Sequence, residues 1–135
     1  MGRGSGTEIA NAARMGSINY RDLIAWQKAM DFVKAVYKAT ESMPADERFG
    51  LVRQMRRAGV SIPANIAEGE GRRYSGAFLN HLSIAYGSLR ELETHLILAQ
   101  RLRHLSPEQV EPLLLQAAEV GRLINGLIRS KGAPC

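Results

Sequence analysis

Residues 75–103 read SGAFLNHLSIAYGSLRELETHLILAQRLR, and their apolar positions recur at alternating spacings of four and three residues. These positions are Phe78, Leu82, Ala85, Leu89, Leu92, Leu96 and Ala99. Such spacings place all of them on one face of an α-helix, in the heptad pattern by which helices pack side by side. The stretch therefore predicts one long amphipathic helix from Ser75 to about Arg103, packed against other helices.

Two further segments have the same periodicity. The segment 20–42 should end before Pro44, because a proline disfavours the α conformation in the residue that precedes it. The last segment starts at Ser106, with Pro107 at the first helical position, and ends near Gly132. The apolar stripe of the former is Leu23, Trp26, Met30, Val33 and Tyr37, widened by Ala29, Phe32 and Val36. That of the latter is Leu113, Ala117, Val120, Ile124 and Leu127.

The segment 46–71 carries a heptad around a proline, formed by Val52, Met55, Gly59, Ile62 and Ile66. The ring of Pro63 would collide with the carbonyl group of Gly59, and glycine has the backbone freedom to move away. We therefore predict one helix that is kinked at Pro63 rather than two helices. Because all connections are short, neighbouring helices should run antiparallel. The predicted fold is all-α, an up-down-up-down four-helix bundle.

Composition and the two ends define the predicted domain. The 135 residues are 45% hydrophobic but only 6% aromatic, so one aliphatic core is expected. Residues 1–17 are rich in Gly, Ala and Ser, which predicts a tag, linker or flexible arm before the bundle domain at 18–130. Residues 131–135 form a predicted tail that ends in the lone Cys135. We expect a cytoplasmic location, since no signal-peptide or membrane-spanning stretch is recognisable.

The stretch 61–69 reads SIPANIAEG and is followed by Gly71-Arg72. It resembles the signature of the four helix bundle protein family, also called 23S rRNA intervening-sequence proteins or S23-like proteins. Two further blocks match, Asp22-Leu23-x-x-Trp26-Gln27-x-Ala29 and the segment 78–94, so that the resemblance covers residues 20–130. It implies a bundle that assembles into a ring, typically a homopentamer. Some members resemble the accessory protein of diversity-generating retroelements, a basic pentamer that binds a reverse transcriptase and nucleic acid.

Basic residues concentrate on and after the segment 46–71. Arg53, Arg56 and Arg57 are spaced i, i+3, i+4 and should share one helix face. Arginine matches the geometry of phosphate groups, and the net charge of +5 agrees with a polyanionic partner. Since few aromatic residues accompany the arginines, binding would follow the nucleic-acid backbone without sequence preference. The candidate nucleic-acid-binding residues are Arg53, Arg56, Arg57, Arg72 and Arg73. The alternative is a solvated helix face, paired with acidic residues such as Asp46, Glu47 and Glu70.

A polar line formed by Ser61, Asn65 and Glu68 runs beside the apolar seam. With Gly59 and Pro63 it makes up a predicted structural motif. Ser61 and Asn65 should hydrogen-bond to backbone groups near the proline, and Glu68 should pair with an arginine of the same or a neighbouring subunit. A single glutamate without a base or metal ligands makes a poor catalytic site.

Catalytic, metal and cofactor sites are not indicated. A di-iron centre in a helical bundle needs paired Glu-x-x-His motifs, whereas Glu91 and His95 are four residues apart and no second motif exists. His81, His95 and His104 are expected at the surface rather than as metal ligands. No glycine-rich phosphate loop follows a strand. We therefore expect no enzymatic activity, no cofactor and no small-molecule substrate.

The apolar positions exceed what one internal seam needs, and the surplus is Ile24, Phe32, Val36, Leu79, Ile97, Leu114 and Ile128. Such a surplus indicates either an interface between copies or a wide monomer core. The small residues Ala85, Gly87 and Ser88 would permit close approach of another helix. The favoured hypothesis is a non-enzymatic oligomer, most simply a pentameric ring, whose basic surface binds RNA, DNA or a reverse-transcriptase-like protein. The alternative is a purely structural assembly module, including an engineered ring or cage component with appended termini.

Overall fold

A computed structural model describes residues 19–72 and 75–132 of the chain. The described residues form four α-helices and two short 3-10 turns, without any strand. These elements are η1 (Tyr20–Asp22), α2 (Ile24–Thr40), η2 (Ala45–Glu47), α3 (Leu51–Arg72), α4 (Ser75–Arg101) and α5 (Pro107–Gly132). The predicted all-α, four-helix fold is confirmed. The predicted arm at 1–17 and the terminal Cys135 lie outside the described residues.

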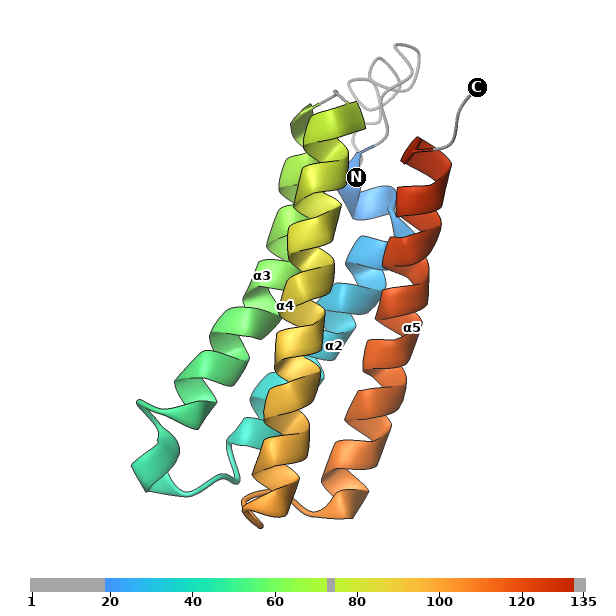
Figure 1. The fold of residues 1–135 in the computed structure, drawn as a ribbon. Helices are drawn as coiled ribbons and strands as arrows, with labels where there is room; N and C mark the ends of the chain where they lie inside the picture. Colours follow the sequence, from blue (N-terminus) through green and yellow to red (C-terminus); the bar gives the residue numbers. More distant parts are fainter. Residues whose placement is uncertain (1–18, 73–74, 133–135) are drawn as a thin grey trace, which may run out of the picture.

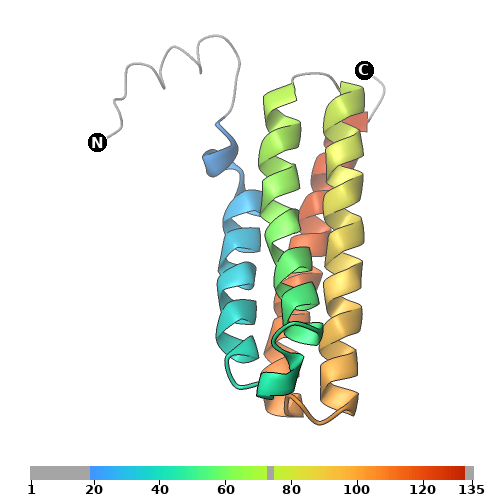
Figure 2. The same ribbon diagram turned by 90° about the vertical axis from the view of Figure 1, so that its left-hand side faces the viewer.

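The four helices enclose one core. Consecutive helices run in opposite directions along a common long axis (Figure 1). α2 and α4 each pack against both α3 and α5, so that every helix has two neighbours (Figure 2). All the heptad positions predicted in 75–103 are buried, as are the apolar side chains that α3 and α5 turn toward them. The heptad pattern therefore identified the core face of these three helices correctly.

The predicted core stripe of α2 is wrong in its main positions, whereas Ala29, Phe32 and Val36, predicted to widen it, are buried. Its buried residues are Ala25, Ala29, Phe32, Val36 and Thr40, whereas Met30 is 45% exposed and Tyr37 is 39% exposed. Both the buried stripe and the stripe through Met30 and Tyr37 have helical spacing. The buried one contains Ala25 and Ala29, whose small side chains let the backbone of α2 approach the core closely. Of the two alternatives for the surplus residues, the wide core is therefore correct for Phe32 and Val36.

α3 continues as one helix from Leu51 to Arg72 through the buried Pro63, as predicted. The bend at Pro63 stays a prediction. Gly59 is buried, and a Cβ atom there would lie 3.6 Å from a methyl carbon of Leu92 and 3.8 Å from one of Val33. Those are ordinary contact distances, so packing alone does not require a glycine at this position. A glycine is favourable here because its backbone can move away from the ring of Pro63.

Gly69 allows α3 and α4 to approach closely near the turn that joins them. A Cβ atom on Gly69 would lie 2.8 Å from His81 Cβ and 2.8 Å from Phe78 Cδ1, too close for any side chain. By contrast, Gly87 on α4 has open space around it. The tight helix crossing is therefore located at Gly69.

The opposite end of the bundle is held by local caps and by long-range contacts, one of which is a bond of 3.0 Å that Gln109 Nε2 donates to Ser42 Oγ. The Oε1 atom of Glu47 accepts a hydrogen bond of 3.1 Å from the backbone N–H of Leu51, and so caps α3. The Oε2 atom of Glu47 lies 3.0 Å from His104 Nε2, in the loop between α4 and α5. At the start of α5, Ser106 and Gln109 exchange reciprocal side-chain bonds of 3.2 Å and 3.0 Å to each other's backbone N–H groups. This capping box confirms the predicted helix start.

Candidate functional site

The arginines predicted to share one face of α3 divide into two groups. Arg53 and Arg57 are exposed and lie one turn apart on the outer side of the helix. Arg56 is turned toward α2, where its Nε donates a hydrogen bond of 2.9 Å to Thr40 Oγ1. Its second terminal nitrogen donates to the carbonyl oxygen of Tyr37 at 3.3 Å, and its guanidinium lies 4.5 Å from the centre of the Tyr37 ring. Arg56 therefore holds the last turn of α2 against α3.

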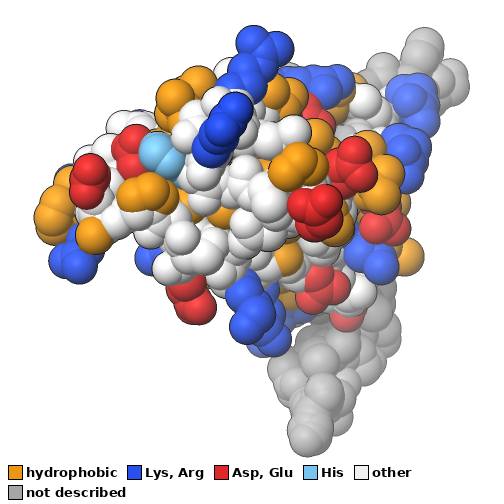
Figure 3. Space-filling view, turned by 90° about the horizontal axis from the view of Figure 1, so that it is seen from below, with side chains coloured by type: hydrophobic (Ala, Val, Ile, Leu, Met, Phe, Trp, Pro, Cys, Tyr) orange, Lys and Arg blue, Asp and Glu red, His pale blue; other side chains and the backbone are white. Residues whose placement is uncertain are grey.

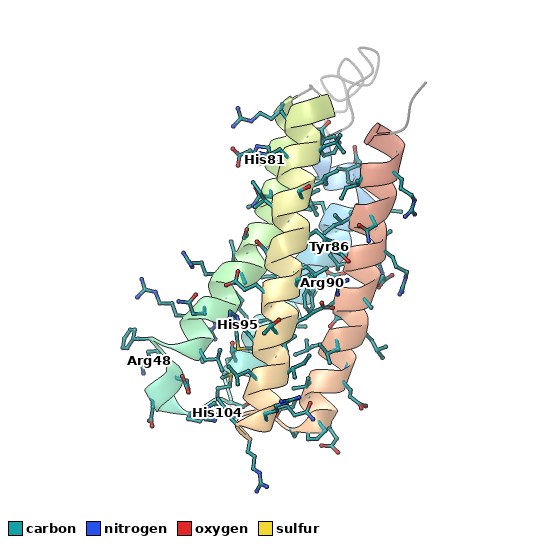
Figure 4. All side chains as sticks on the ribbon, viewed as in Figure 1. Arg48, His81, Tyr86, Arg90, His95 and His104 are labelled. Atoms are coloured by element: carbon teal, nitrogen blue, oxygen red, sulfur yellow. The ribbon has the colours of Figure 1, made fainter. Side chains whose placement is uncertain are left out.

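The remaining candidate arginines differ in their surroundings. Arg72 donates a hydrogen bond of 2.9 Å to Glu68, four residues earlier, which is the intrasubunit form of the predicted pair. Both side chains are about half exposed, so this ion pair contributes little to stability. Arg73 lies outside the described residues. Arg48 precedes α3 at an outer corner of the molecule (Figure 4) and lies over the ring of Phe49, 5.6 Å from its centre.

The turn before α3 and most of α3 contain basic residues without acidic ones. From Arg48 to Ala67 the chain contains no acidic residue, and its charged side chains are Arg48, Arg53, Arg56 and Arg57. The end of the bundle that carries η2 differs, because acidic side chains lie between the basic ones over that surface (Figure 3). The run of arginines without an acid therefore extends from the turn before α3 into that helix and ends at Glu68.

A chain of polar side chains joins α3 to α4. The Nδ2 atom of Asn65 donates to the carbonyl oxygen of Ser61 at 2.9 Å and to its hydroxyl group at 3.0 Å. The hydroxyl groups of Ser61 and Ser88 lie 2.8 Å apart. On its other side, Asn65 Oδ1 lies 3.0 Å from Nδ1 of His81, which points from α4 toward α3 (Figure 4). Because this amide oxygen can only accept, His81 carries a proton on Nδ1.

The bond from Asn65 to the Ser61 backbone agrees with the role predicted for these residues, whereas the partners on α4 were missed. His81 and Ser88 are polar residues seven positions apart, so they lie on one side of α4. The seven-residue spacing therefore indicated a polar side of α4 that could bond to the polar line of α3. The half-buried position of His81 also differs from the surface position expected for the histidines.

Phe49 was missed for a different reason. It lies between η2 and α3, outside every apolar stripe, and is 76% exposed. Helical periodicity cannot detect such a residue. The only signal in the sequence was an aromatic residue between Arg48 and Gly50, near the start of a run that lacks acidic residues.

A groove between α4 and α5 has a volume of about 270 Å³ and is lined by Tyr86, Arg90, Glu93, Gly121 and Arg122, among others. Arg90 and Tyr86 lie on the side of α4 that faces α5 (Figure 4). Arg90 donates a hydrogen bond of 2.8 Å to Glu93 and another to the Tyr86 hydroxyl group. The bond that Arg90 donates to the Glu93 carboxylate raises the pKa of Arg90 above its usual value. The charge of Arg90 is therefore already balanced within the chain.

Within residues 19–72 and 75–132, no three His, Cys, Asp or Glu side chains gather as a metal site would require. Nor does any helix in these ranges have the length and apolar character to cross a bilayer.

The sequence model of one family, described as 23S rRNA-intervening sequence protein, matches residues 21–126. The chain belongs to this family. The match spans α2, α3 and α4 and most of α5, so it includes both the polar chain and the arginines of α3. It confirms the resemblance carried by the stretch 61–69.

A solved structure supports the same assignment to the 23S rRNA-intervening sequence proteins. It is the 1.70 Å crystal structure of a protein of unknown function from the S23 ribosomal protein family of Bacteroides thetaiotaomicron VPI-5482. The two chains are 28% identical with a TM-score of 0.71, and the alignment covers 78% of this chain and 99% of the other. No curated protein matches this chain.

Proposed function

We propose that this member of the 23S rRNA-intervening sequence protein family is a non-enzymatic, cytoplasmic oligomer that binds nucleic acid along the outer side of α3. The observation that carries the proposal is the acid-free run from Arg48 to Ala67, which presents Arg53 and Arg57 to solvent on one face. An arginine fork can bind a phosphate group through two parallel hydrogen bonds. Since Arg56 and Arg72 are engaged within the chain, Arg53 and Arg57 are the principal contacts.

The proposed oligomer is a ring of five chains. Its support is the number of large apolar side chains left exposed, including Met30 and Tyr37 on α2 and Val60 on α3. Two of the predicted surplus residues, Ile24 and Ile97, are exposed as well. Where such side chains form one contiguous patch, they commonly mark an interface. Assembly would also repeat the Arg53–Arg57 pair around the ring, and phosphate contacts weaken with salt in proportion to their number.

Binding to RNA tests the proposal directly. Fluorescence anisotropy with a labelled RNA at about 50 mM salt should show binding that weakens steeply as salt is raised. The double variant R53A/R57A should bind more weakly and with a smaller salt slope. The matched control R122A/R129A removes two exposed arginines of α5 and should change binding much less. If the wild-type protein does not bind RNA or DNA under these conditions, nucleic-acid binding by this protein is excluded.

Light scattering tests the assembly. Five chains of 14.8 kDa should give a mass of about 74 kDa, and a monomer mass would exclude a ring. The proposal includes a nucleic-acid enzyme, such as a reverse-transcriptase-like protein, as a partner that uses the same arginines.

A second candidate function is a purely structural assembly module. It is favoured by Leu115, which is 73% exposed on α5, away from the arginines of α3. This candidate predicts an oligomer whose mass and stability do not change in R53A/R57A and which does not bind RNA. The two measurements above therefore separate the two functions.

A further inference from the structure

Phe49 is the most exposed large apolar side chain in the described part of the chain, with 76% of its surface open to solvent. It lies in the turn that connects η2 to α3, and its side chain takes no part in the core. An exposed phenyl ring gains nothing for the stability of the bundle, because the hydrophobic contribution comes from removing apolar surface from water. The position of Phe49 therefore calls for an explanation other than folding.

The charged residues that follow this ring along the chain, as far as Ala67, are all positive. The guanidinium of Arg48 lies 5.6 Å from the ring centre, within the range of a cation–π contact. Arg53 and Arg57 follow Phe49 by four and eight residues, and both are exposed. They are separated from each other by about 6 Å along the helix axis. The nearest acid, Glu47, is engaged by the Leu51 N–H group and by His104.

An open aromatic ring beside a line of arginines is the arrangement by which proteins bind single-stranded nucleic acid. The arginines follow the phosphate backbone, while the ring stacks on a base that is not paired. A duplex would have to unstack a base step to use such a ring, because its bases already stack on each other inside the helix. Contact with the identical corner of a second copy is a weaker explanation, since it would place arginines against arginines. In a ring of five, Phe49 would instead meet a different face of its neighbour, and the solution mass of F49A tests that alternative.

We propose that Phe49 and Arg48 form a stacking site for an unpaired base of a single-stranded nucleic acid whose phosphates contact Arg53 and Arg57. This inference rests on the proposed function and narrows its ligand from nucleic acid in general to single strands. It also replaces the expectation of binding through the backbone alone, which followed from the low aromatic content of the sequence.

The test compares two RNA probes, an unstructured single strand of about 20 nucleotides and a duplex of the same length, at about 50 mM salt. In F49A the affinity for the single strand should fall about tenfold, because stacking on one base is lost. The affinity for the duplex should stay within about twofold, because the duplex contacts only the arginines. The matched control is L115A, which removes an equally exposed apolar side chain, 73% open, from α5.

A conservative variant adds a direct readout. F49W keeps an aromatic face at this position and should restore the affinity for the single strand. The natural chain has one tryptophan, the half-buried Trp26, so stacking at position 49 should appear as additional quenching of tryptophan emission when the single strand is added. Thermal melting of each variant shows that the bundle is intact.

The outcomes are distinguishable. If the wild-type protein binds the single strand but F49A binds it as L115A does, the stacking site is wrong and the proposed function stands. If F49A weakens both probes equally and also lowers the solution mass, Phe49 is a contact between copies and the inference is overturned. If the wild-type protein binds neither probe, the proposed function and the stacking site both fail.

Discussion

The hydroxyl groups of Ser61 and Ser88 form a hydrogen bond of 2.8 Å that links α3 to α4. Ser61 is also the acceptor for the side-chain amide of Asn65, whose oxygen accepts from His81. The pair is therefore one link in a continuous polar chain that crosses between two helices twice.

We predict that Ser61 and Ser88 are energetically coupled. In a double-mutant cycle with S61A and S88A, the coupling free energy should be about 0.5–1.5 kcal/mol, the net value of one protein hydrogen bond. Urea unfolding at one fixed protein concentration measures it. The control is S83A, at an exposed serine of α4, which should change the unfolding free energy by less than about 0.5 kcal/mol. Strict additivity of the two serine variants would contradict the coupling.

We predict that Arg56 stabilises the bundle, whereas its neighbours do not. Replacing Arg56 with alanine removes the bonds to Thr40 and to the Tyr37 carbonyl, together with the contact to the Tyr37 ring. The expected loss is about 1–3 kcal/mol of unfolding free energy. The matched controls R53A and R57A should each cost less than about 0.5 kcal/mol, since both side chains are exposed. Equal effects of all three variants would show that Arg56 has no special role.

We predict that Glu47 makes the protein less stable in acid. The bond from the Leu51 N–H group, and then the bond from His104, lowers the pKa of Glu47 below the usual value of a glutamate, about 4.5. A carboxyl group whose folded pKa is lowered contributes stability above its unfolded pKa and loses it as the pH falls through the folded value. The unfolding free energy should therefore decrease as the pH falls below about 4.5, and less so in E47Q. Parallel pH profiles for the two proteins would contradict this role.

We predict that an alanine at position 69 separates α3 from α4. A Cβ atom would lie 2.8 Å from both His81 Cβ and Phe78 Cδ1, so the helices must move apart. The expected cost is about 1–3 kcal/mol, which thermal or urea unfolding measures. G87A is the matched control, because nothing lies within 4 Å of a Cβ atom there. It should stabilise α4 by about 0.5–1 kcal/mol through helix propensity. A neutral G69A would show that the crossing is not tight.

Periodicity predicted the core faces of α3, α4 and α5 because each has one apolar stripe of large side chains. It failed for α2, where the stripe through Phe32 and Val36 competes with the one through Met30 and Tyr37. Both have helical spacing, and only the close approach permitted by Ala25 and Ala29 selects between them. Spacing describes one helix, whereas burial depends on how closely its neighbours can pack.

The candidate site shows the same limit. The i, i+4 contact between Ser61 and Asn65 is local and follows from the sequence. The bond to Ser88 depends on which face α4 turns toward α3. Likewise, the spacing of Arg53, Arg56 and Arg57 shows that they are neighbours but not that α2 lies against Arg56. Phe49 belongs to no periodic segment, so only the three-dimensional structure shows its exposure.

The contact between Glu47 and His104 also has a consequence for synthesis on the ribosome. These residues are 57 positions apart, and translation proceeds from the N-terminus at about 5–20 residues per second. The local cap on Leu51 can form as soon as α3 emerges, but His104 leaves the exit tunnel seconds later. During that interval, Glu47, two residues before Phe49, has its bond from the Leu51 N–H group but not yet the one from His104. The turn that carries Phe49 therefore gains this long-range contact only when the turn between α4 and α5 arrives, as the bundle closes.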